Sequence, residues 1–524
     1  MDRRPHDLDD RSGDPVVVQH WLGAPAFSYE RRPDTVPDVL DRAIRLWPDA
    51  PGFLEPDGAV TTYAAFGARV ERAAASLVGR GLRPGDAVAV AAGNTLDLAT
   101  LLHACARAGL VMVGLNTRLA PDQWTYMVAV MECRLLLAEP AYALPGAERL
   151  ADVLREAPDQ PWSYAEVHRP AEDATYAVVF TSGTTGRPKA SQVVHRSSVH
   201  SAMSYQRVLA LEPGEVTAVL FALYYISAQH AHVLPAMLGG ATCLLLDGPS
   251  PREYVDLLER YEVSWAYAVP SWWRLCLRVE GFRDLPHLRR LAAGGAPFGA
   301  DLEGALRERL PATLLHDVYG LSETHSPATL LLDHEFAGRP GCVGRLLDCM
   351  EAEVRDDAGV ALPPGSPGQL WLRGSLVTTG YAHNDEATRA AIVNGWFDTG
   401  DVARIDADGY VWVLDRSKDM INRGGTKIFS AELEELLREH PSIEDAAAVP
   451  VPDNTAGEAV AVFLVLSAPV TPAEVRAWVR TGMADYAAPK VVHFVDALPR
   501  NATGKTDKLS LRNVARGGFM GLRT

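Results

Sequence analysis

The chain has 524 residues, 48% hydrophobic and 22% charged, a composition that fits a folded globular protein and excludes a disordered or fibrous one. Its formal net charge of −16 argues against nucleic acid or an anionic membrane as the main partner, because binding to either needs a basic surface. The six cysteines are scattered without CxxC pairs, which predicts neither a zinc site nor disulfides and favours a reducing, cytoplasmic setting.

The first 35 residues are predicted to be a flexible tail that leads into the fold. The segment MDRRPHDLDDRSGDP mixes both signs of charge and is followed by no apolar stretch of the signal-peptide kind. No run of 18 apolar residues occurs anywhere, so we expect no membrane span. The length, at roughly 150 residues per domain, predicts several packed units.

Alternating helical and strand-like patterns between residues 37 and 280 predict an α/β fold. The helical pattern FGARVERAAASLVGRG is followed by the short apolar strand DAVAVAAG, with glycine at the joins. The buried strands AVVF, TAVLFAL, ATCLLL and SWAYAVP recur between helices at 176–280. We therefore expect parallel sheets covered by helices.

The pattern changes between about 342 and 415 to short strands with tight turns, as in EAEVRDDAGVALPPGSPGQLWLRG. This change predicts a small antiparallel barrel or sheet. Beyond it, a glycine turn precedes a helix and a strand. The expected organisation is a large N-terminal domain at 36–415, with two helix-covered sheets and a small β-barrel, and a small, mobile α+β C-terminal domain at 416–524.

A loop rich in small polar residues follows the buried strand VVF at 178–180. In VVFTSGTTGRPKA, the glycines let backbone N–H groups approach phosphate oxygens, the hydroxyls donate further bonds, and Lys189 adds charge. The spacing differs from GxxxxGK[ST], so this is no Walker A loop, and a flexible surface loop is the alternative. The predicted phosphate-binding residues are Thr181, Ser182, Gly183, Thr184, Thr185, Gly186 and Lys189.

Two further segments carry groups that a bound nucleotide needs. In HDVYGLSETHSP, Tyr319 offers an aromatic surface and Glu323 a carboxylate for magnesium, although a structural turn explains the same pattern. In NGWFDTGDVARIDADGYVWVLDRSKDMINRGGTKI, Asp401 suits the two ribose hydroxyls and Arg416 the sugar or a phosphate. Taken separately, either charge is more often part of a surface turn.

The segment LPRNATGKTDK places Lys505 near the C-terminus. Gly504, Lys505 and Thr506 imitate a Walker A ending, but Pro499 stands where the first glycine is required. A lysine on a mobile domain is instead suited to stabilising a reacting carboxylate and an α-phosphate.

These four motifs, in this order, resemble those of the adenylate-forming superfamily of acyl-CoA synthetases, luciferases and nonribosomal adenylation domains over residues 35–512. GGAP at 294–297 is similar to the superfamily's adenine-site turn, and GWFDTGD to its ribose motif. The resemblance implies an ATP- and Mg²⁺-dependent ligase that adenylates a small carboxylic acid, releases pyrophosphate and transfers the acyl group to a thiol, first of all coenzyme A. One alternative is that the acceptor is a phosphopantetheinyl carrier protein or another, non-CoA group. A second alternative is that the chain is a non-catalytic, nucleotide-binding relative of these enzymes. A homodimer stays open.

The resemblance also implies a role for each matching residue. The 181–189 loop would hold the β- and γ-phosphates, Glu323 magnesium, and Ser322 the α-phosphate. Lys505 would bridge the acid and the nucleotide, and Lys418 would be the hinge of a domain rotation. The remaining implied contacts are Gly295, Ala296, Pro297 and Tyr319 around adenine, Asp401 and Arg416 at ribose, and Gly424 and Gly425 beside a thiol tunnel.

Departures from the superfamily pattern concern the acid and the acceptor. ALYYISAQ at 222–229 puts Tyr225 in the place of a histidine, and Asn422 stands where some relatives have a lysine that assists thiol transfer. The predicted acid pocket consists of Tyr224, Tyr225, Ser227 and Gly294. Its tyrosines favour an aromatic or hydroxylated acid, whereas Ser227 disfavours an α-amino acid; a medium-chain acid stays open.

Two conspicuous pairs have competing explanations. His230 and His232 are spaced two apart in QHAH and suit either a metal site or a packed helix start. Trp272 and Trp273 suit either a wall of the acid pocket or the core.

Overall fold

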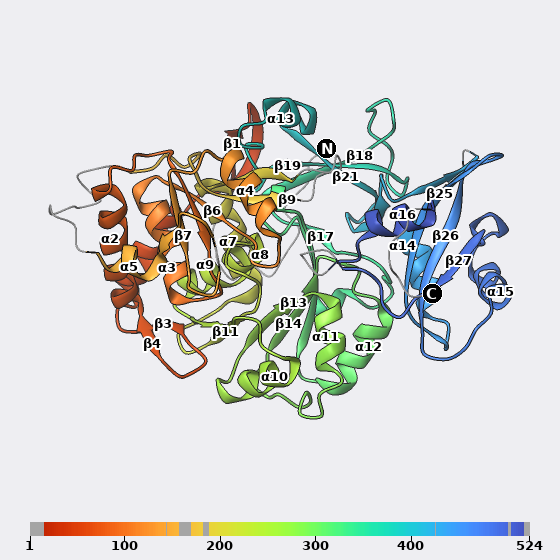
Figure 1. Ribbon diagram of the computed structural model, residues 1–524, viewed down its shortest axis with the longest axis horizontal. Coiled ribbons are helices and arrows are strands. Elements are labelled where there is room, and N and C mark those ends of the chain that lie inside the picture. The colour runs from red at the N-terminus through yellow and green to blue at the C-terminus, as the bar shows by residue number, and fades with distance from the viewer. Residues whose placement is uncertain are drawn as a thin grey trace. The chain divides into compact units, whose positions relative to one another are not determined.

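The computed structural model describes residues 15–142, 144–156, 169–181, 188–424, 426–500 and 505–517. The chain forms two compact units (Figure 1). The first unit comprises the residues up to Ala352 together with Leu372–Phe397, and the second comprises Glu353–Trp371 and Asp398 onward. Each unit has sheets and a core of its own.

The first unit contains a six-stranded sheet in the order β10-β9-β6-β5-β7-β8. Its neighbours are parallel except β9 and β10, which are antiparallel. All residues of the central strand AVAVA are buried, as expected where helices cover both faces of a parallel sheet. The strands are β5 (Ala87–Ala91), β6 (Val111–Gly114), β7 (Leu135–Ala138), β8 (Glu148–Arg149), β9 (Thr175–Thr181) and β10 (Lys189–Val194).

A second, nine-stranded sheet of this unit has the order β17-β16-β15-β14-β13-β11-β12-β3-β4. Its inner neighbours, from β15 to β3, pair in parallel, and antiparallel strands lie at both ends. The strands are β3 (Pro51–Leu54), β4 (Val60–Thr62), β11 (Val216–Val219), β12 (Thr242–Leu245), β13 (Trp265–Ala268), β14 (Arg290–Gly294), β15 (Leu314–Tyr319), β16 (Thr329–Leu331) and β17 (Arg345–Leu346).

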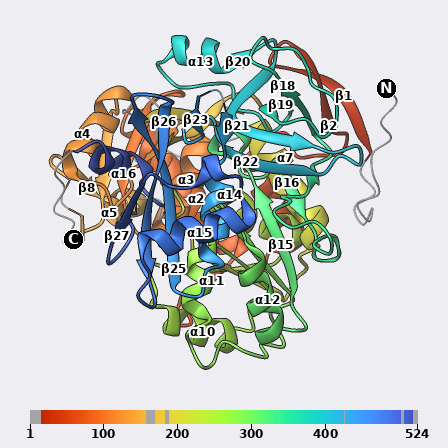
Figure 2. The ribbon, with the colours of Figure 1, turned by 90° about the vertical axis from the view of Figure 1, so that its right-hand side faces the viewer.

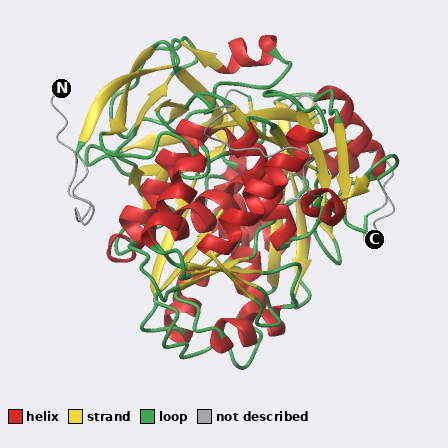
Figure 3. Cartoon of the chain, turned by 90° about the vertical axis from the view of Figure 1, so that its left-hand side faces the viewer, coloured by secondary structure: helices red, strands yellow, loops and turns green. Residues whose placement is uncertain are grey.

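Helices of the first unit gather into a layer with strands on either side of it (Figure 3). In this layer α1 contacts α2, α3, α7 and α9. Capping residues set where several helices begin: Ser250 accepts from the Glu253 N–H at the start of α10, with Pro251 as the first helical residue. The helices are α1 (Val36–Leu46), α2 (Tyr63–Gly79), α3 (Leu96–Ala108), α4 (Pro121–Val130), α5 (Leu150–Arg155), α7 (His195–Leu209), α8 (Ile226–Ala228), α9 (Leu234–Gly239), α10 (Pro251–Arg260), α11 (Pro270–Cys276), α12 (Ala300–Arg309) and α13 (Asp385–Ala391).

A five-stranded sheet follows in the order β18-β19-β21-β20, with β22 paired to β21. The division between the two units falls within β18, β19 and β21. The strands are β18 (Met350–Arg355), β19 (Gly368–Gly374), β20 (Ile392–Val393), β21 (Trp396–Ile405) and β22 (Val411–Arg416).

The C-terminal sheet of the second unit has the order β24-β23-β26-β25 with β27 beside β26, and helices of the same unit pack against it (Figure 2). Because side chains alternate along a strand, Val460, Val462 and Leu464 pack with α14 and α15. Ala461 and Phe463 face the opposite way and pack with α16. The elements are β23 (Ile421–Arg423), β24 (Thr426–Ile428), α14 (Ser430–Arg438), β25 (Ile443–Asp453), β26 (Gly457–Leu466), α15 (Pro472–Gly482), β27 (Val491–Phe494) and α16 (Lys508–Ala515).

The predicted fold class is confirmed: a large α/β N-terminal part with two helix-covered sheets precedes a small α+β C-terminal part. The predicted tail at 1–35 needs a correction, because β1 (Val16–Trp21) and β2 (Ala24–Tyr29) form an antiparallel pair there. Trp21, Ala26 and Tyr29 are buried, which ties this pair down. Residues 1–14 lie outside the described ones, and the domain boundary at 415/416 stays a prediction.

No helix among the described residues is long and apolar enough to cross a bilayer.

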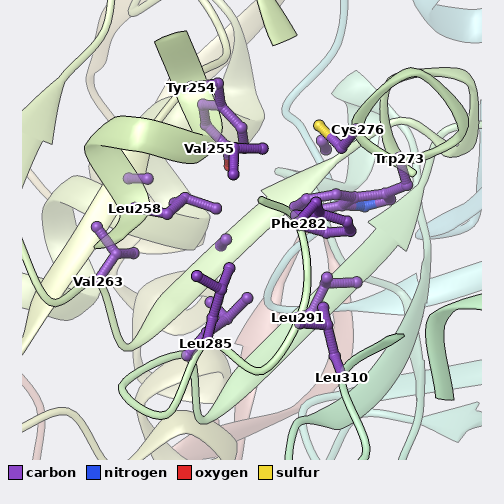
Figure 4. Packing of buried hydrophobic residues seen from close by; sticks show 14 of the residues in the cluster. Tyr254, Val255, Leu258, Val263, Trp273, Cys276, Phe282, Leu285, Leu291 and Leu310 are labelled. Atoms are coloured by element: carbon purple, nitrogen blue, oxygen red, sulfur yellow. The ribbon is translucent and has the colours of Figure 1, made fainter. Parts of the chain in front are cut away.

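One apolar cluster of the first unit lies between the nine-stranded sheet and α10–α12 (Figure 4). Trp273 is fully buried in it, stacks on Phe282 and donates from its indole N–H to the Ala292 carbonyl at 2.9 Å. Trp272 is partly buried against the same cluster. The tryptophan pair therefore belongs to the core.

Replacing Trp273 by alanine should lower the free energy of unfolding by about 3–5 kcal/mol, because the cluster loses a large side chain and one buried hydrogen bond. Leu275→Ala is the matched control, since Leu275 lies on the same helix and is 42% exposed. Urea unfolding of both variants checks this expectation. Equal losses in the two variants would contradict the packing assigned to Trp273.

Candidate active site

Two predicted nucleotide-binding segments begin where neighbouring strands end. β14 and β15 pair in parallel, with Gly294 opposite Val318, so the residues after both strands emerge at the same edge of the sheet. A Cβ at Gly294 would come within 2.5 Å of the Val318 carbonyl oxygen, and Gly295 has a φ of +79°. Both positions therefore need glycine. The structure brings Gly294–Pro297 close to Tyr319.

Glu323 lies in the 3₁₀ turn η2 (Ser322–Thr324), directly after β15, and is buried. Its carboxylate atom Oε1 accepts a hydrogen bond of 2.9 Å from the Tyr381 hydroxyl. The backbone carbonyl of Glu323 accepts from the Thr378 N–H at 2.7 Å. Both the side chain and the backbone of this acid are thus held by the segment that follows β19.

The predicted phosphate loop connects two antiparallel strands, because Thr181 at the end of β9 pairs with Lys189 at the start of β10. The loop residues Ser182, Gly183, Thr184, Thr185 and Gly186 lie outside the described ones. The ammonium Nζ of Lys189 lies 4.9 Å from the centroid of the Tyr381 ring. Tyr381 therefore contacts both Lys189 and Glu323, although the sequence analysis did not single it out.

The predicted pocket tyrosines share one partner, Asn116, which follows β6. The Asn116 amide Nδ2 donates to the Tyr225 hydroxyl at 2.7 Å, and its Oδ1 accepts from the Tyr224 hydroxyl at 3.3 Å. The two rings lie 4.9 Å apart. Burial raises the pKa of the Tyr225 hydroxyl, so this group stays protonated and can also donate a bond.

Two residues of this region escaped the sequence analysis because each lies inside an apolar strand. Tyr267 on β13 shares a hydrogen bond with Ser227, and its hydroxyl lies 2.6 Å from where a Cβ of Gly294 would stand. The structure thereby brings Ser227 and Gly294 together. Asp317 on β15 is buried, and burial raises the pKa of its carboxyl from 3.8 to about 8.

His230 and His232 are buried in the π-helical turn η1 (Gln229–Val233). His232 Nδ1 contacts the Thr217 hydroxyl at 2.5 Å, and burial lowers the pKa of this ring to about 3. His230 lies beside Tyr176 and His325. Among the described residues, no group of three or more His, Cys, Asp or Glu side chains could hold a metal ion. His230 and His232 are therefore packed in the core at the start of a helix, which was the alternative to a metal site.

The predicted ribose-binding residues are cross-strand partners in the second unit. Asp401 on β21 pairs with Arg416 on β22, and the Arg416 Nε lies 3.1 Å from the Asp401 Oδ1. The Asp401 side chain is almost fully buried, whereas that of Arg416 is 42% exposed. The pair therefore presents a cationic group above a fixed carboxylate.

Lys505 lies in the second unit, just before α16. Desolvation by the surrounding protein lowers the pKa of its ammonium to about 8; Arg416 and Lys418 act in the same direction, whereas Asp401 opposes them. The residue as a whole is exposed, and Arg416 and Lys418 are the like charges beside it. The structure brings Lys505 together with the predicted ribose and hinge residues.

The predicted thiol-tunnel turn connects β23 to β24. Gly424 has a φ of +60°, and its N–H donates to the Ala456 carbonyl at 2.8 Å; Gly425 lies outside the described residues. The backbone N–H of Asn422 donates to the Glu458 carboxylate at 2.7 Å. These contacts fix the turn.

Two family models match the chain. That of the AMP-binding enzymes covers residues 40–382, and that of the AMP-binding enzyme C-terminal domain covers 432–505. A feruloyl-CoA synthase from a Streptomyces species is 33% identical over 486 residues, spanning 90% of this chain and 97% of that enzyme. A 2-succinylbenzoate–CoA ligase from Bacillus licheniformis is 31% identical, spanning 90% and 98%.

Solved structures agree with these matches. The o-succinylbenzoate CoA synthetase of Bacillus subtilis in complex with its acyl-adenylate intermediate has a TM-score of 0.83 and 27% identity, covering 92% of this chain and 99% of that one. The same enzyme in complex with ATP and a magnesium ion has a TM-score of 0.82 and 28% identity, covering 91% and 98%.

Asp317→Asn should change how stability depends on pH. In the folded state the carboxyl binds its proton up to about pH 8, whereas in the unfolded state it loses it near pH 3.8, so its contribution to stability falls as pH rises between these values. The asparagine variant should lack this fall, which amounts to at most about 1.4 kcal/mol per pH unit.

Chemical unfolding at several pH values checks this expectation. Asp256→Asn is the control, because Asp256 is exposed on α10. If the stability of wild type and of Asp317→Asn depended on pH in the same way, the pKa of the buried Asp317 carboxyl would not be raised.

Proposed function

We propose the following reaction for this chain, which belongs to the adenylate-forming superfamily of AMP-binding enzymes. It activates a carboxylic acid with ATP to an acyl-adenylate and then transfers the acyl group to the thiol of coenzyme A. The observation that carries this proposal is near full-length similarity to acid–CoA ligases, including one solved with its acyl-adenylate. The fixed carboxylate of Glu323 and the cationic group around Lys505 agree with it.

In the first half-reaction, a carboxylate oxygen of the acid attacks the α-phosphorus of ATP, and the bond to the bridging oxygen breaks. Pyrophosphate leaves with that electron pair. Lys505 would hold the incoming carboxylate and the α-phosphate together, and Ser322 would contact the α-phosphate. Lys189 and the loop from Thr181 would hold the β- and γ-phosphates. No protein nucleophile is needed, since catalysis here consists of positioning and charge stabilisation.

Glu323 fits a magnesium site built largely by the nucleotide. Mg²⁺ usually takes one or two protein carboxylates, while phosphates and water complete its shell. Glu323 is buried beside the ends of β14 and β15, and its Oε1 is fixed by a donor. The bound ion would neutralise phosphate charge. Adenine would lie against Gly295, Ala296, Pro297 and Tyr319, and ribose against Asp401 and Arg416.

The second half-reaction would follow a rotation of the C-terminal domain about Lys418. The CoA thiolate then attacks the acyl carbon, and AMP leaves with the former carboxylate oxygen. Gly424 and Gly425 would flank the path of the thiol. Asp415, before the hinge, accepts hydrogen bonds from the backbone N–H and the hydroxyl of Ser430, after it. These two bonds connect the strand before Lys418 to the helix after it.

A phosphopantetheinyl carrier protein is the second candidate acceptor. Asn422 stands where some relatives have a lysine that assists thiol transfer, which leaves the choice between the thiols of CoA and of a carrier protein to the experiment below. For the acid, the hydroxyls gathered around Asn116 support an aromatic or hydroxylated substrate. Tyr224, Tyr225, Ser227 and Gly294 would form its pocket.

Exchange of labelled pyrophosphate into ATP over a panel of aromatic and aliphatic acids tests adenylation, and mass spectrometry after adding CoA tests transfer. Acid-dependent exchange followed by a CoA thioester supports the proposal. Exchange without formation of a CoA thioester would indicate that the acyl acceptor is a carrier protein or another group instead of CoA. ATP binding without exchange for any acid would refute it.

Lys505→Ala should lower acid-dependent pyrophosphate exchange by roughly a hundredfold or more, because the ammonium acts on charge that develops in the transition state. The dissociation constant for ATP should change little. Lys490→Ala is the control, since Lys490 is an exposed lysine of the same unit that pairs with Asp453. Unchanged exchange in Lys505→Ala would remove its assigned role.

Tyr225→Phe should change which acid is preferred, because the ring stays while the hydroxyl held by Asn116 is lost. The ratio of kcat/KM between a hydroxylated acid and its deoxy analogue should shift by about tenfold or more. Tyr261→Phe, which loses a hydroxyl bonded to the Pro56 carbonyl, should leave the ratio unaltered. A uniform fall for all acids would show that Tyr225 is structural.

A further inference from the structure

Tyr381 joins two charged groups of the first unit that the proposed function assigns to different parts of the nucleotide. It follows β19, is 7% exposed, and donates from its hydroxyl to Glu323 Oε1 at 2.9 Å. The face of its ring lies 4.9 Å from the Lys189 ammonium. The Tyr381 side chain thus contacts both Glu323, in the turn η2, and Lys189, on the strand β10.

The backbone around Glu323 is fixed without help from the Tyr381 side chain. His325 Nε2 accepts from the Val194 N–H at 3.1 Å, so its Nδ1 carries the proton and donates to the Leu376 carbonyl at 2.9 Å. The Glu323 carbonyl accepts from Thr378. Because these bonds fix the backbone, only the side-chain torsions of Glu323, and so the orientation of its carboxylate, are left for other contacts to fix.

The backbone of Tyr381 is likewise held by other groups. Its N–H donates to the Thr388 hydroxyl at 2.9 Å, and the next N–H, that of Ala382, donates to the Ala190 carbonyl at 2.8 Å. The segment therefore stays attached to β10 when the tyrosine hydroxyl is removed. This separates the chemistry of the hydroxyl from the folding of the segment.

The hydroxyl and the ring have distinct consequences. An ionised carboxylate only accepts hydrogen bonds, so Tyr381 is the donor, and its bond to Oε1 turns the second oxygen away from Tyr381. An aromatic face attracts an ammonium and restricts where it can move. The single side chain of Tyr381 thereby restrains both Glu323 and Lys189.

We propose that Tyr381 is a positioning residue that aims the Glu323 carboxylate at the metal ion and holds Lys189 for the terminal phosphates of the same nucleotide. The inference rests on the proposed function, in which these two residues bind the magnesium–ATP complex. Tyr381 itself touches neither the acid nor the reacting atoms in this account.

Two substitutions separate the two roles. Tyr381→Phe removes the bond to Glu323 and keeps the ring, so the Mg²⁺ concentration for half-maximal pyrophosphate exchange should rise by about three- to tenfold, with the KM for ATP at saturating Mg²⁺ unchanged. Tyr381→Leu also removes the aromatic face and should additionally raise the KM for ATP. Tyr29→Phe is the matched control, because it loses a buried hydroxyl bond to Ser204 elsewhere in the same unit.

A second readout does not depend on turnover. The increase of the unfolding temperature on adding ATP is followed as Mg²⁺ is titrated, and Tyr381→Phe should need several-fold more Mg²⁺ for half of the increase. Tyr29→Phe should lower the unfolding temperature without changing this requirement.

Each outcome decides the inference. A wild-type Mg²⁺ requirement in Tyr381→Phe, or an equal shift in Tyr29→Phe, would overturn it. An unchanged KM for ATP in Tyr381→Leu would overturn the part concerning Lys189. If none of the tested acids supports pyrophosphate exchange by the wild-type protein, the proposed function fails. The unfolding-temperature titration still decides the role of Tyr381 in that case.

Discussion

The hydrogen bond between Tyr381 and Glu323 is the interaction on which the proposed nucleotide site of the first unit depends. A carboxylate that binds a metal ion must be buried enough to attract it and fixed enough not to collapse onto a neighbouring cation. Burial, two left-handed residues at 325 and 326, and the bonds of His325 to Val194 and Leu376 hold the turn around Glu323. Tyr381 also contacts Lys189, so one side chain touches both charged groups.

The two units contribute complementary chemistry. The first contains the glycine turn after β14, Tyr319 at the end of β15 and the buried carboxylate of Glu323. The second contains Asp401, Arg416, Lys418 and Lys505, where desolvation and then the charges of Arg416 and Lys418 lower the pKa of the Lys505 ammonium. In the proposed reaction, a phosphate or a carboxylate would offset the repulsion among the three positive charges.

The sequence predicts those elements whose signal is local. Strands such as AVAVA and the motif residues at strand ends follow from apolar runs and from small polar residues beside them. Tyr381 escaped because its partner lies 58 residues away and nothing in the intervening sequence marks the contact. Asp317 and Tyr267 look like interruptions of apolar strands, and their surroundings exist only after the strands pair. The β1–β2 pair is not marked in the sequence, because mixed charges precede it and the burial of alternate residues in APAFSY exists only once the strands pair.

The central claim is that the acid becomes joined to AMP through its own carboxylate oxygen. An acid labelled with ¹⁸O in the carboxylate, chosen from those that support pyrophosphate exchange, tests this claim most directly. The account predicts that AMP isolated after thioester formation carries one ¹⁸O atom, while pyrophosphate carries none. Unlabelled AMP, or label in pyrophosphate or in inorganic phosphate, would contradict an acyl-adenylate intermediate and with it the roles assigned to both units.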